Sequence, residues 1–413
     1  MRLLHTADWH LGQTLHGQSR AEEQALALDW LLATCEERAV DCLIVAGDIF
    51  DVASPAEEAR RLYYDFLARL ARGPLKWVVV VAGNHDSPRM VSAAKSLAAA
   101  MGIHVVAEPA ADPADDLLEL RDPDTGELAA VVAGIPFLHD RHVRRSRAGA
   151  SAADRDADLA AGIHRHFDGM AAGCADHVGA VPVVATGHLY ATGASARDGQ
   201  DNIYVGNVRN LDAGRLPAAF DYVALGHIHR AQALRGAEHV RYSGSLIPLD
   251  FQECTDEKGV WCVDLAAGRP PEIEYLASPV NRRLKQISGG YEEVAQRLTD
   301  FCARHAEDAL PPWIEVVLDG GYVDEAQRTA LREIAEPSGA RILKFTRRRA
   351  KPSEGGRAAA APAPERLDEL TVEEVFERRC APAELDVAAR ARVGRLFAQV
   401  LADARAGKTE VAA

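Results

Sequence analysis

The sequence predicts an α/β fold in which β-sheets and helices form layers. Short apolar runs of strand length alternate with helical patterns near the amino terminus, and several of these runs end at a small residue beside a polar one. The chain has 413 residues, which is enough for one large domain and one or two smaller ones. We therefore expect a layered α/β domain accompanied by smaller parts.

Strands and helices alternate at the start of the chain. The first strands are expected at RLLHTADW, DCLIVAGD and KWVVVVAG, and the last of these is the run richest in β-branched residues. Between the first two, apolar residues recur at helical spacing and mark one buried face, at Leu28, Leu31, Leu32 and Cys35. The next helix is expected to begin with Ser54 as its N-cap, Pro55 in the first helical position and Glu57 completing a capping box.

Further strands complete the large domain, which we expect to cover residues 1–279. They are predicted at LAAVVAGIPF, PVVATGHL, DYVALGHI, VRYSGS and GVWCVDLA, with helices less regularly placed between them. After Pro279 the pattern changes. Helices near residues 294–303 and 326–334 alternate with the strands RRLKQISG, WIEVVLDG and ARILKFT, so residues 280–349 are expected to form a small α+β domain of β-α-β-α-β order.

The end of the chain differs in composition. Residues 350–366 are rich in Pro, Gly and Ala and lack large apolar side chains, which predicts a flexible linker. Residues 367–413 carry amphipathic helical patterns and are expected to form a helical tail. Because such a tail must bury its apolar face, it packs either on its own protein or on a partner helix.

Composition bounds the class of protein. No apolar run is long enough to span a membrane, and the amino terminus lacks the pattern of a signal peptide. The seven cysteines are scattered and form no C-x-x-C pair, which argues against a disulfide framework and against a structural zinc site. We therefore expect a cytoplasmic protein in a reducing compartment.

The charge balance is unusual for a protein that would bind nucleic acid alone. The net charge is −14 at pH 7, whereas proteins that grip DNA usually carry a basic surface. Positive charge is concentrated in the run from Lys344 to Lys351 and in a stretch containing Arg141, Arg144, Arg145 and Arg147. Either these stretches suffice for binding, or a partner supplies much of it, or both are ordinary solvated surface charge.

Side chains that bind metals follow the predicted strands. The set consists of Asp8, His10, Asp48, Asn84, His85, Asp86, His188, His227 and His229. The carboxyl ends of strands are where sites assemble in open α/β sheets. Residues two apart on a strand point the same way, so Asp8 with His10, and His227 with His229, are expected to face one centre.

Carboxylate, imidazole and amide ligands together suit divalent metals such as Mn²⁺, Fe²⁺ and Zn²⁺. Two such ions roughly 3.5–4 Å apart hold a hydroxide and clamp the oxygens of a phosphoryl group. Asp48 is the natural bridging carboxylate, and His85 is placed to stabilise or protonate the leaving oxygen. Each short motif alone occurs by chance, but the ordered set at strand ends predicts a two-metal phosphoesterase.

The ordered motifs D-x-H, G-D-x-x-D, G-N-H-D, G-H and G-H-x-H resemble those of the calcineurin-like metallophosphoesterases over roughly the first two-thirds of the chain. In more detail, HTADWHLGQ, AGDIFD, VVAGNHDSP, NIYVGNV, YVALGHIHRAQ and VRYSGSLIPLDFQE are similar to the bacterial SbcD-type nuclease subunits. Residues 280–349 resemble the DNA-capping domain of that family, and residues 367–413 resemble its helical attachment to an SbcC-type ATPase.

The resemblance implies roles for individual residues. One metal would be held by Asp8, His10, Asp48 and His229, and the other by Asp48, Asn84, His188 and His227. His85 would be the catalytic acid or transition-state stabiliser, and the carboxylate of Asp51 would orient it. Archaeal and eukaryotic relatives tend to carry a histidine in place of Asp51, so no role of that histidine transfers to this chain.

The implied activity is Mn²⁺-supported cleavage of DNA phosphodiesters, by exonuclease action on double strands and endonuclease action on single strands or hairpins, in DNA end processing and repair. ATP would be used by the SbcC-type partner, since this chain has no G-x-x-x-x-G-K-[ST] motif. A homodimer within a heterotetramer is also implied. If the partner supplies much of the DNA-binding surface, this subunit need not be basic.

Two alternatives remain open from the sequence. The same scaffold serves phosphodiesterases that act on a small nucleotide substrate, although the basic run near residue 344 and the tail favour a larger one. A metallophosphoesterase fold kept only as a binding scaffold would be expected to lose metal ligands, and this chain retains the whole set.

Overall fold

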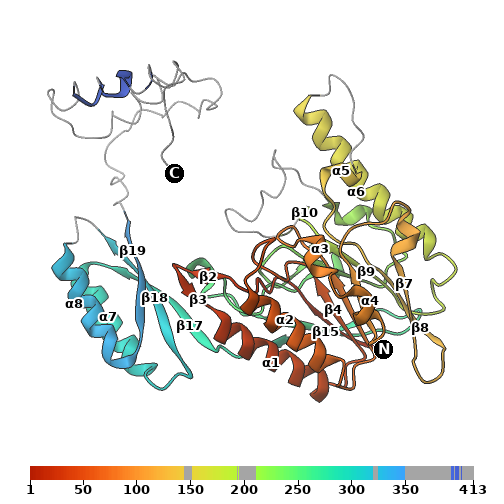
Figure 1. Ribbon diagram of the computed structural model, residues 1–413, viewed down its shortest axis with the longest axis horizontal. Helices are drawn as coiled ribbons and strands as arrows, with labels where there is room; N and C mark the ends of the chain where they lie inside the picture. The colour runs from red at the N-terminus through yellow and green to blue at the C-terminus, as the bar shows by residue number, and fades with distance from the viewer. Residues whose placement is uncertain are drawn as a thin grey trace. The chain divides into compact units, whose positions relative to one another are not determined.

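The computed structural model describes residues 1–143, 151–192, 194, 211–319, 324–348, 392–394, 396–399 and 401 (Figure 1). Met1–Arg349 form one compact unit and Ala350–Ala413 another. The predicted linker, most of the predicted tail, the NIYVGNV motif and Arg144, Arg145 and Arg147 lie outside the described residues. In the second unit, residues 392–394 and 396–399 are helical.

Two six-stranded mixed sheets form the body of the first unit. The first has the order β16-β15-β1-β4-β5-β6, with bounds Glu272–Ala277, Gly259–Asp264, Arg2–Thr6, Cys42–Ala46, Trp77–Val81 and Ile103–Val106. The second has the order β13-β14-β12-β9-β8-β7, with bounds Gln232–Leu234, Ala237–Tyr242, Tyr222–Gly226, Val183–His188, Leu128–Ala133 and Leu117–Arg121. In the first sheet β1, β4, β5 and the edge strand β6 run parallel, and in the second sheet β14, β12, β9 and β8 run parallel.

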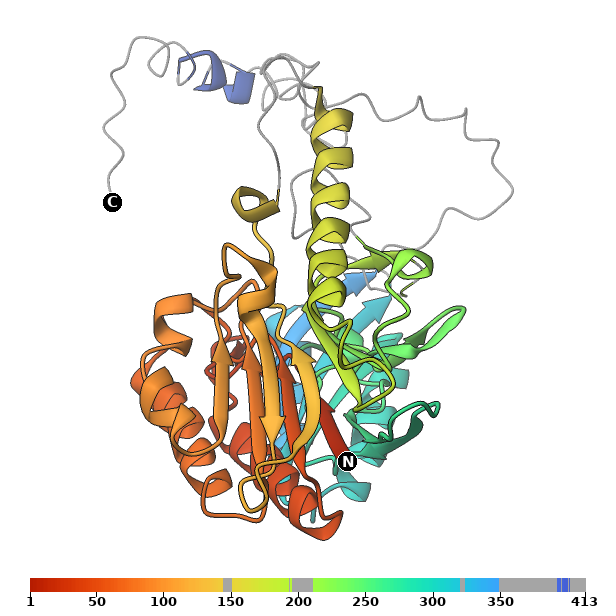
Figure 2. The ribbon, with the colours of Figure 1, turned by 90° about the vertical axis from the view of Figure 1, so that its right-hand side faces the viewer.

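The alternation of side chains along the strands builds the layers. On β4, Leu43 and Val45 pack against helices α1 (Ala21–Glu37) and α2 (Glu57–Leu70), whereas Cys42 and Ile44 face the second sheet. The outer face of the second sheet packs on α6 (Ala152–Gly173), which Figure 2 shows in yellow, rising beyond the ends of the strands. The predicted α/β fold with sheets flanked by helices is confirmed.

Three later strands of the first unit form a separate parallel sheet. It consists of β17 (Arg282–Gly289), β18 (Leu310–Asp319) and β19 (Arg341–Arg348), with α7 (Tyr291–Arg304) and α8 (Glu325–Ala335) as the connections. The β-α-β-α-β order was therefore predicted correctly. This sheet and its two helices enclose their own apolar core, which supports the division at residue 279 that we retain as a proposal.

Short elements complete the unit. They are β2 (Thr14–Leu15), β3 (Gln18–Ser19), α3 (Pro88–Val91), α4 (Lys95–Ala99), α5 (Asp140–Val143), β10 (Ala191–Thr192) and β11 (Leu211–Asp212), with short 3₁₀ turns at Pro113–Asp116, Ala213–Arg215, Phe251–Glu253 and Glu336–Ser338. Among the described residues no helix is long and apolar enough to cross a lipid bilayer.

Several local predictions were incomplete or wrong. The predicted cap of α2 at Ser54 is wrong, because the helix begins at Glu57 and its N-cap is Ala56, whose ψ of 158° is extended. Pro55 therefore precedes the helix instead of starting it. The sequence patterns also did not single out β6, β7, β13, β16 or α6. In β7 and β16 most residues are half-buried or exposed, so their apolar runs are short.

Candidate metal centre

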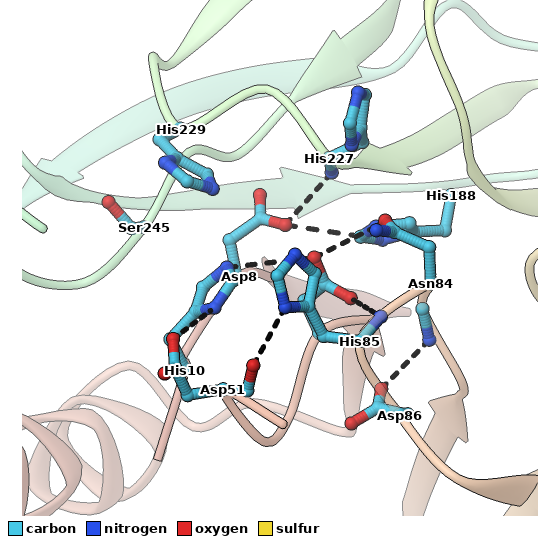
Figure 3. A network of polar contacts seen from close by, with 12 residues as sticks. Asp8, His10, Asp51, Asn84, His85, Asp86, His188, His227, His229 and Ser245 are labelled. Carbon is cyan, nitrogen blue, oxygen red and sulfur yellow. Dashed lines mark hydrogen bonds and ion pairs between the residues drawn. The ribbon is translucent and has the colours of Figure 1, made fainter. Parts of the chain in front are cut away.

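The residues that the motifs singled out lie at the carboxyl ends of strands from both sheets. Asp8 and His10 follow β1, Asp48 follows β4, Asn84 and His85 follow β5, His188 ends β9, and His227 and His229 follow β12. The strands β1, β4 and β5 belong to one sheet and β9 and β12 to the other, so both sheets deliver side chains to one place (Figure 3).

Potential ligand atoms from different loops approach one another closely. In the part of the chain that the structure describes, three groups have all their ligand atoms within 4.8 Å of each other. They are Asp8 with His10 and His229, Asp8 with Asp48 and His188, and His10 with Asp51 and His85. The groups overlap through Asp8 and His10, which suits adjacent ions better than separate ones.

Asp48 lies between the two sides of this centre. Its Oδ2 is 3.6 Å from His10 Nε2 and 3.2 Å from His188 Nε2. Its Oδ1 accepts the backbone N–H of His85 at 2.9 Å. His188 Nε2 also lies 3.0 Å from Asn84 Oδ1, which brings the predicted amide ligand to the His188 side. One carboxylate oxygen of Asp48 therefore faces imidazoles from both sheets.

His227 is placed differently from the other predicted ligands. Its backbone N–H donates to Asp8 Oδ1 at 2.9 Å, and its ring centre lies 5.5 Å from that of His188. Its imidazole belongs to none of the three groups found among the described residues, and Figure 3 shows the ring turned away from Asp8. Its ligand role stays a prediction.

The loops that carry these residues adopt left-handed backbone conformations. The φ angles are 54° at Asp8, 47° at His10, 51° at Asp48 and 98° at His227. Such conformations cost roughly 1–3 kcal/mol each outside glycine and persist only where the surroundings enforce them. Strand alternation was therefore the wrong reason for pairing Asp8 with His10, because β1 ends at Thr6 and both residues lie in the loop beyond it.

Close packing keeps the loops in these conformations. A Cβ at Gly83 would collide with the Asp48 side chain, and one at Gly226 would collide with the Ala46 carbonyl, so neither position accepts a larger residue. The buried carboxylate of Asp86 accepts the backbone N–H groups of Ile49, Phe50 and Gly83. Asp86 thereby joins the G-D-x-x-D loop to the G-N-H-D loop.

Burial and mutual charge set the protonation of the metal-free centre. Burial alone would raise the pKa of Asp48, but the imidazoles of His188 and His10 bring that pKa below its usual range. Burial alone would lower the pKa of His188, but Asp48 and Asp8 raise it to about 9. Without a cation the centre therefore holds a proton on His188, and a divalent ion would take the place of that proton.

Two buried atoms of the centre have the chemistry of cation ligands. Among the described residues, Asp8 Oδ2 and His10 Nε2 are buried without a hydrogen-bond partner. Buried polar atoms are nearly always paired, so unpaired ones need an explanation. Both atoms belong to residues of the first ligand group, and imidazole, carboxylate and amide oxygen are ligands of borderline divalent metals. The residues present therefore fit divalent cations.

Asp51 contacts His85 in an unexpected way. The predicted contact was through its carboxylate, but His85 Nδ1 donates to the backbone carbonyl of Asp51 at 2.7 Å. The Asp51 carboxylate instead accepts from His10 Nδ1 at 3.2 Å. In these contacts Asp51 orients His10 through its side chain and His85 through its main chain.

Sequence reasoning missed two buried residues beside the centre. Glu253 lies within hydrogen-bonding distance of His229, and Lys258 lies within the same distance of Glu253. Glu253 is part of the segment VRYSGSLIPLDFQE, and the only signal was the resemblance of that segment to a known family. Nothing in its local pattern predicts a partner that lies 24 residues away in the chain.

Two family models match the chain. The model described as calcineurin-like phosphoesterase matches residues 1–231, and the model described as type 5 capsule protein repressor C-terminal domain matches residues 280–383. The first match includes every residue that we predicted for the centre.

Curated relatives match most of the chain. The SbcD subunit of the nuclease SbcCD from Escherichia coli strain K12 is 38% identical over 404 residues, 97% of this chain and 98% of that protein. The protein of the same name from Rhodobacter capsulatus is 34% identical, covering 91% of this chain and 93% of its own length. The Bacillus subtilis protein of that name is 36% identical over 275 residues, 65% of this chain and 67% of its own.

Proposed function

The chain belongs to the calcineurin-like phosphoesterases and, within them, to the SbcD nuclease subunits, and from this membership we propose how its residues cleave DNA. Two divalent cations, with Mn²⁺ the expected metal, would be held at the carboxyl ends of the strands. Asp8, His10, Asp48 and His229 would hold one, and Asp48, Asn84, His188 and His227 would hold the other. The substrate is a DNA phosphodiester, cut by exonuclease action on double strands and by endonuclease action on single strands or hairpins.

The observation that carries this proposal is the position of Asp48 Oδ2, 3.6 Å from His10 Nε2 and 3.2 Å from His188 Nε2. A carboxylate oxygen that lies between imidazoles from two sheets is placed where it could bridge two adjacent cations, each of which would also be bound by one of those imidazoles. The buried, unpaired Asp8 Oδ2 supports the same conclusion, since a bound cation would satisfy it. Such ions would supply the Lewis acidity that polarises the phosphate and activates a water molecule.

His85 is the proposed acid of the reaction. It is exposed, and its Nδ1 donates to the Asp51 carbonyl, so the proton of the neutral ring sits on Nδ1. Nε2 is then the atom that takes up a second proton when the ring becomes an imidazolium, and from Nε2 this proton can pass to the leaving oxygen, which restores the neutral ring. The contact to Asp51 and the bond from its own N–H to Asp48 hold the ring beside the centre.

The parts of the chain after residue 279 are assigned separate roles. We propose that residues 280–349 form a DNA-capping domain, that residues 350–366 form a linker and that residues 367–413 bind an SbcC-type ATPase. A homodimer within a heterotetramer in the cytoplasm follows from the same proposal. An ATPase that provides DNA-binding surface would explain why a nuclease subunit has a net charge of −14.

Digestion of end-labelled duplex and hairpin DNA tests the function directly. With Mn²⁺ we expect both DNA substrates to be cut, and chelation with EDTA should stop the reaction because the ligands then hold no cation. A chromogenic small phosphodiester is tested in parallel. Cleavage of the small ester without cleavage of either DNA would contradict the proposal and favour a phosphodiesterase of small nucleotides.

A further inference from the structure

A buried acidic residue that the proposed mechanism does not use lies behind His229. Glu253 is 3% exposed and ends the short turn Phe251–Glu253 in the connection from β14 to β15. Its Oε1 accepts from His229 Nδ1 at 2.9 Å. A carboxylate only accepts hydrogen bonds, so the imidazole must carry its proton on Nδ1, which leaves the lone pair on Nε2.

Glu253 is held by a buried lysine. Lys258 Nζ donates to Glu253 Oε2 at 2.7 Å, to the backbone carbonyl of His229 at 2.7 Å and to Ser245 Oγ at 2.9 Å. An ammonium group has three donors, and these three bonds use all of them. Lys258 therefore bonds both to the carboxylate of Glu253 and to the main chain of His229, the two residues whose side chains contact each other. Figure 3 shows Ser245 beside His229.

The backbone around Glu253 is fixed as well. Glu253 Oε2 also accepts the N–H of Leu249 at 3.0 Å, and Asp250 caps the turn by accepting the N–H groups of Gln252 and Glu253. Both oxygens of a buried carboxylate are thus bonded in a short, capped turn. A group held in this way keeps a neighbouring imidazole within a narrow range of orientations.

Two of the other predicted histidine ligands, His10 and His188, follow the same pattern. His10 Nδ1 bonds to Asp51 Oδ1 at 3.2 Å, and His188 Nδ1 bonds to the Ala46 carbonyl at 2.9 Å. In each case Nδ1 is bonded to an acceptor and Nε2 faces the centre or lies free to do so. Glu253 is the corresponding acceptor for His229 Nδ1.

We propose that Glu253, locked by Lys258, is a positioning residue that fixes the tautomer and direction of His229 and strengthens it as a metal ligand. This inference rests on the proposed function, in which His229 holds one of the two cations. Outer partners of this kind typically change metal affinity about 10–100-fold when they are removed. Glu253 acts through His229 and does not touch the substrate.

The test is a Mn²⁺ titration of the full-length chain, with free Mn²⁺ followed by electron paramagnetic resonance. In Glu253→Gln we expect the affinity of one of the two Mn²⁺ sites to fall about 10–100-fold while the other stays as in the wild type. Glu253→Asp keeps the charge beside Lys258 but withdraws the carboxylate from His229 by one methylene. It should fold and show the same selective loss.

Glu315→Gln is the matched control. Glu315 is also a buried carboxylate, 4% exposed and paired with a lysine, since Lys344 Nζ lies 2.9 Å from its Oε1, but it belongs to β18. Its neutralisation should leave both Mn²⁺ affinities unchanged. Thermal unfolding of the metal-free variants compares the structural cost of the two substitutions.

The outcomes separate the inference from the function it rests on. A wild-type chain that binds no pair of Mn²⁺ ions overturns both. A wild-type chain that binds two, together with unchanged titrations of Glu253→Gln and Glu253→Asp, overturns the positioning role alone. An equal loss of affinity in Glu315→Gln would also overturn it, because the effect would then come from lost stability.

Discussion

The two sides of the centre hold their histidines in different ways. On one side, His10 and His229 are backed by the carboxylates of Asp51 and Glu253. On the other, His188 is fully buried and its Nδ1 is backed by the main-chain carbonyl of Ala46. A charged side chain can be removed by a substitution, whereas a main-chain carbonyl cannot. Substitutions should therefore be able to change the metal affinity of the carboxylate-backed side. The carbonyl-backed side offers no such acceptor side chain behind His188, so its metal affinity should be harder to change.

The largest loss of metal binding and of DNA cleavage is expected from a substitution of Asp48, which lies between the two sides. Asp48→Asn removes the charge of the oxygen that faces both His10 and His188, so we expect both ions to be lost and DNA cleavage to fall below detection. Metal content by mass spectrometry and digestion of labelled duplex DNA measure the two losses.

Asp41→Asn serves as the control for this substitution. Asp41 directly precedes β4, whereas Asp48 follows the other end of the same strand, and the Asp41 carboxylate accepts the backbone N–H of Arg2, far from the predicted ligands. Both ions should remain bound in this variant. Loss of a single ion in Asp48→Asn would show that the two sides do not share that carboxylate.

A smaller effect is expected at His85, which belongs to neither side. His85→Ala should reduce the rate of DNA cleavage about 10²–10⁴-fold, the range typical of a lost general acid, while both ions stay bound. Rates under single-turnover conditions and metal content are measured on the same preparation. Loss of metal together with activity would make His85 a ligand or a structural support instead.

The carboxylate-backed side is tested by Asp51→Asn. Asparagine keeps the shape of the side chain but removes the charge beside His10 Nδ1, so the affinity of one Mn²⁺ site should fall about 10–100-fold. The His188 side should bind as before. Asp29→Asn, which neutralises a carboxylate in a surface ion pair with Arg69, should change neither affinity. If both sites weaken equally in Asp51→Asn, the distinction between the two sides is wrong.

The smallest effect is a gradual dependence on pH in the metal-free protein. Asp48 and Asp8 raise the pKa of His188 from 6.5 to about 9, although burial opposes this. A raised pKa means that the folded state binds the proton more tightly, so this contribution to stability is complete below about pH 6.5 and is lost as the pH rises through about 9.

Thermal unfolding in EDTA across that range measures this dependence. The unfolding temperature should decrease with rising pH in the wild type and decrease less in His188→Gln. Identical slopes for the two proteins would remove His188 as the source.

The sequence predicted the large features because they depend on local patterns. Strand ends carrying Asp, Asn and His are visible in the apolar runs that precede them, and in a parallel sheet those ends meet at one edge. For this reason it could be predicted without coordinates that Asp8, Asp48 and His188 lie at or just after the ends of strands. The order of the small β-α-β-α-β sheet followed from its alternating patterns in the same way.

The details of the centre depend on contacts between distant segments. Glu253 meets His229 only because the connection from β14 to β15 folds back over the loop after β12. The Asp51 carboxylate bonds to His10 Nδ1 because of the geometry of its loop, and the spacing of residues in the sequence does not predict that geometry. The left-handed conformations at Asp8 and Asp48 are likewise imposed by packing, so a rule for regular strands could not anticipate them.

The central claim is that Asp48 is shared by two adjacent cations. Anomalous diffraction at the manganese edge from crystals soaked in Mn²⁺ tests it most directly. The account predicts two peaks about 3.5–4 Å apart, one toward His10 and one toward His188, with Asp48 Oδ2 between them. A single peak, or two peaks that do not both contact Asp48, would contradict it.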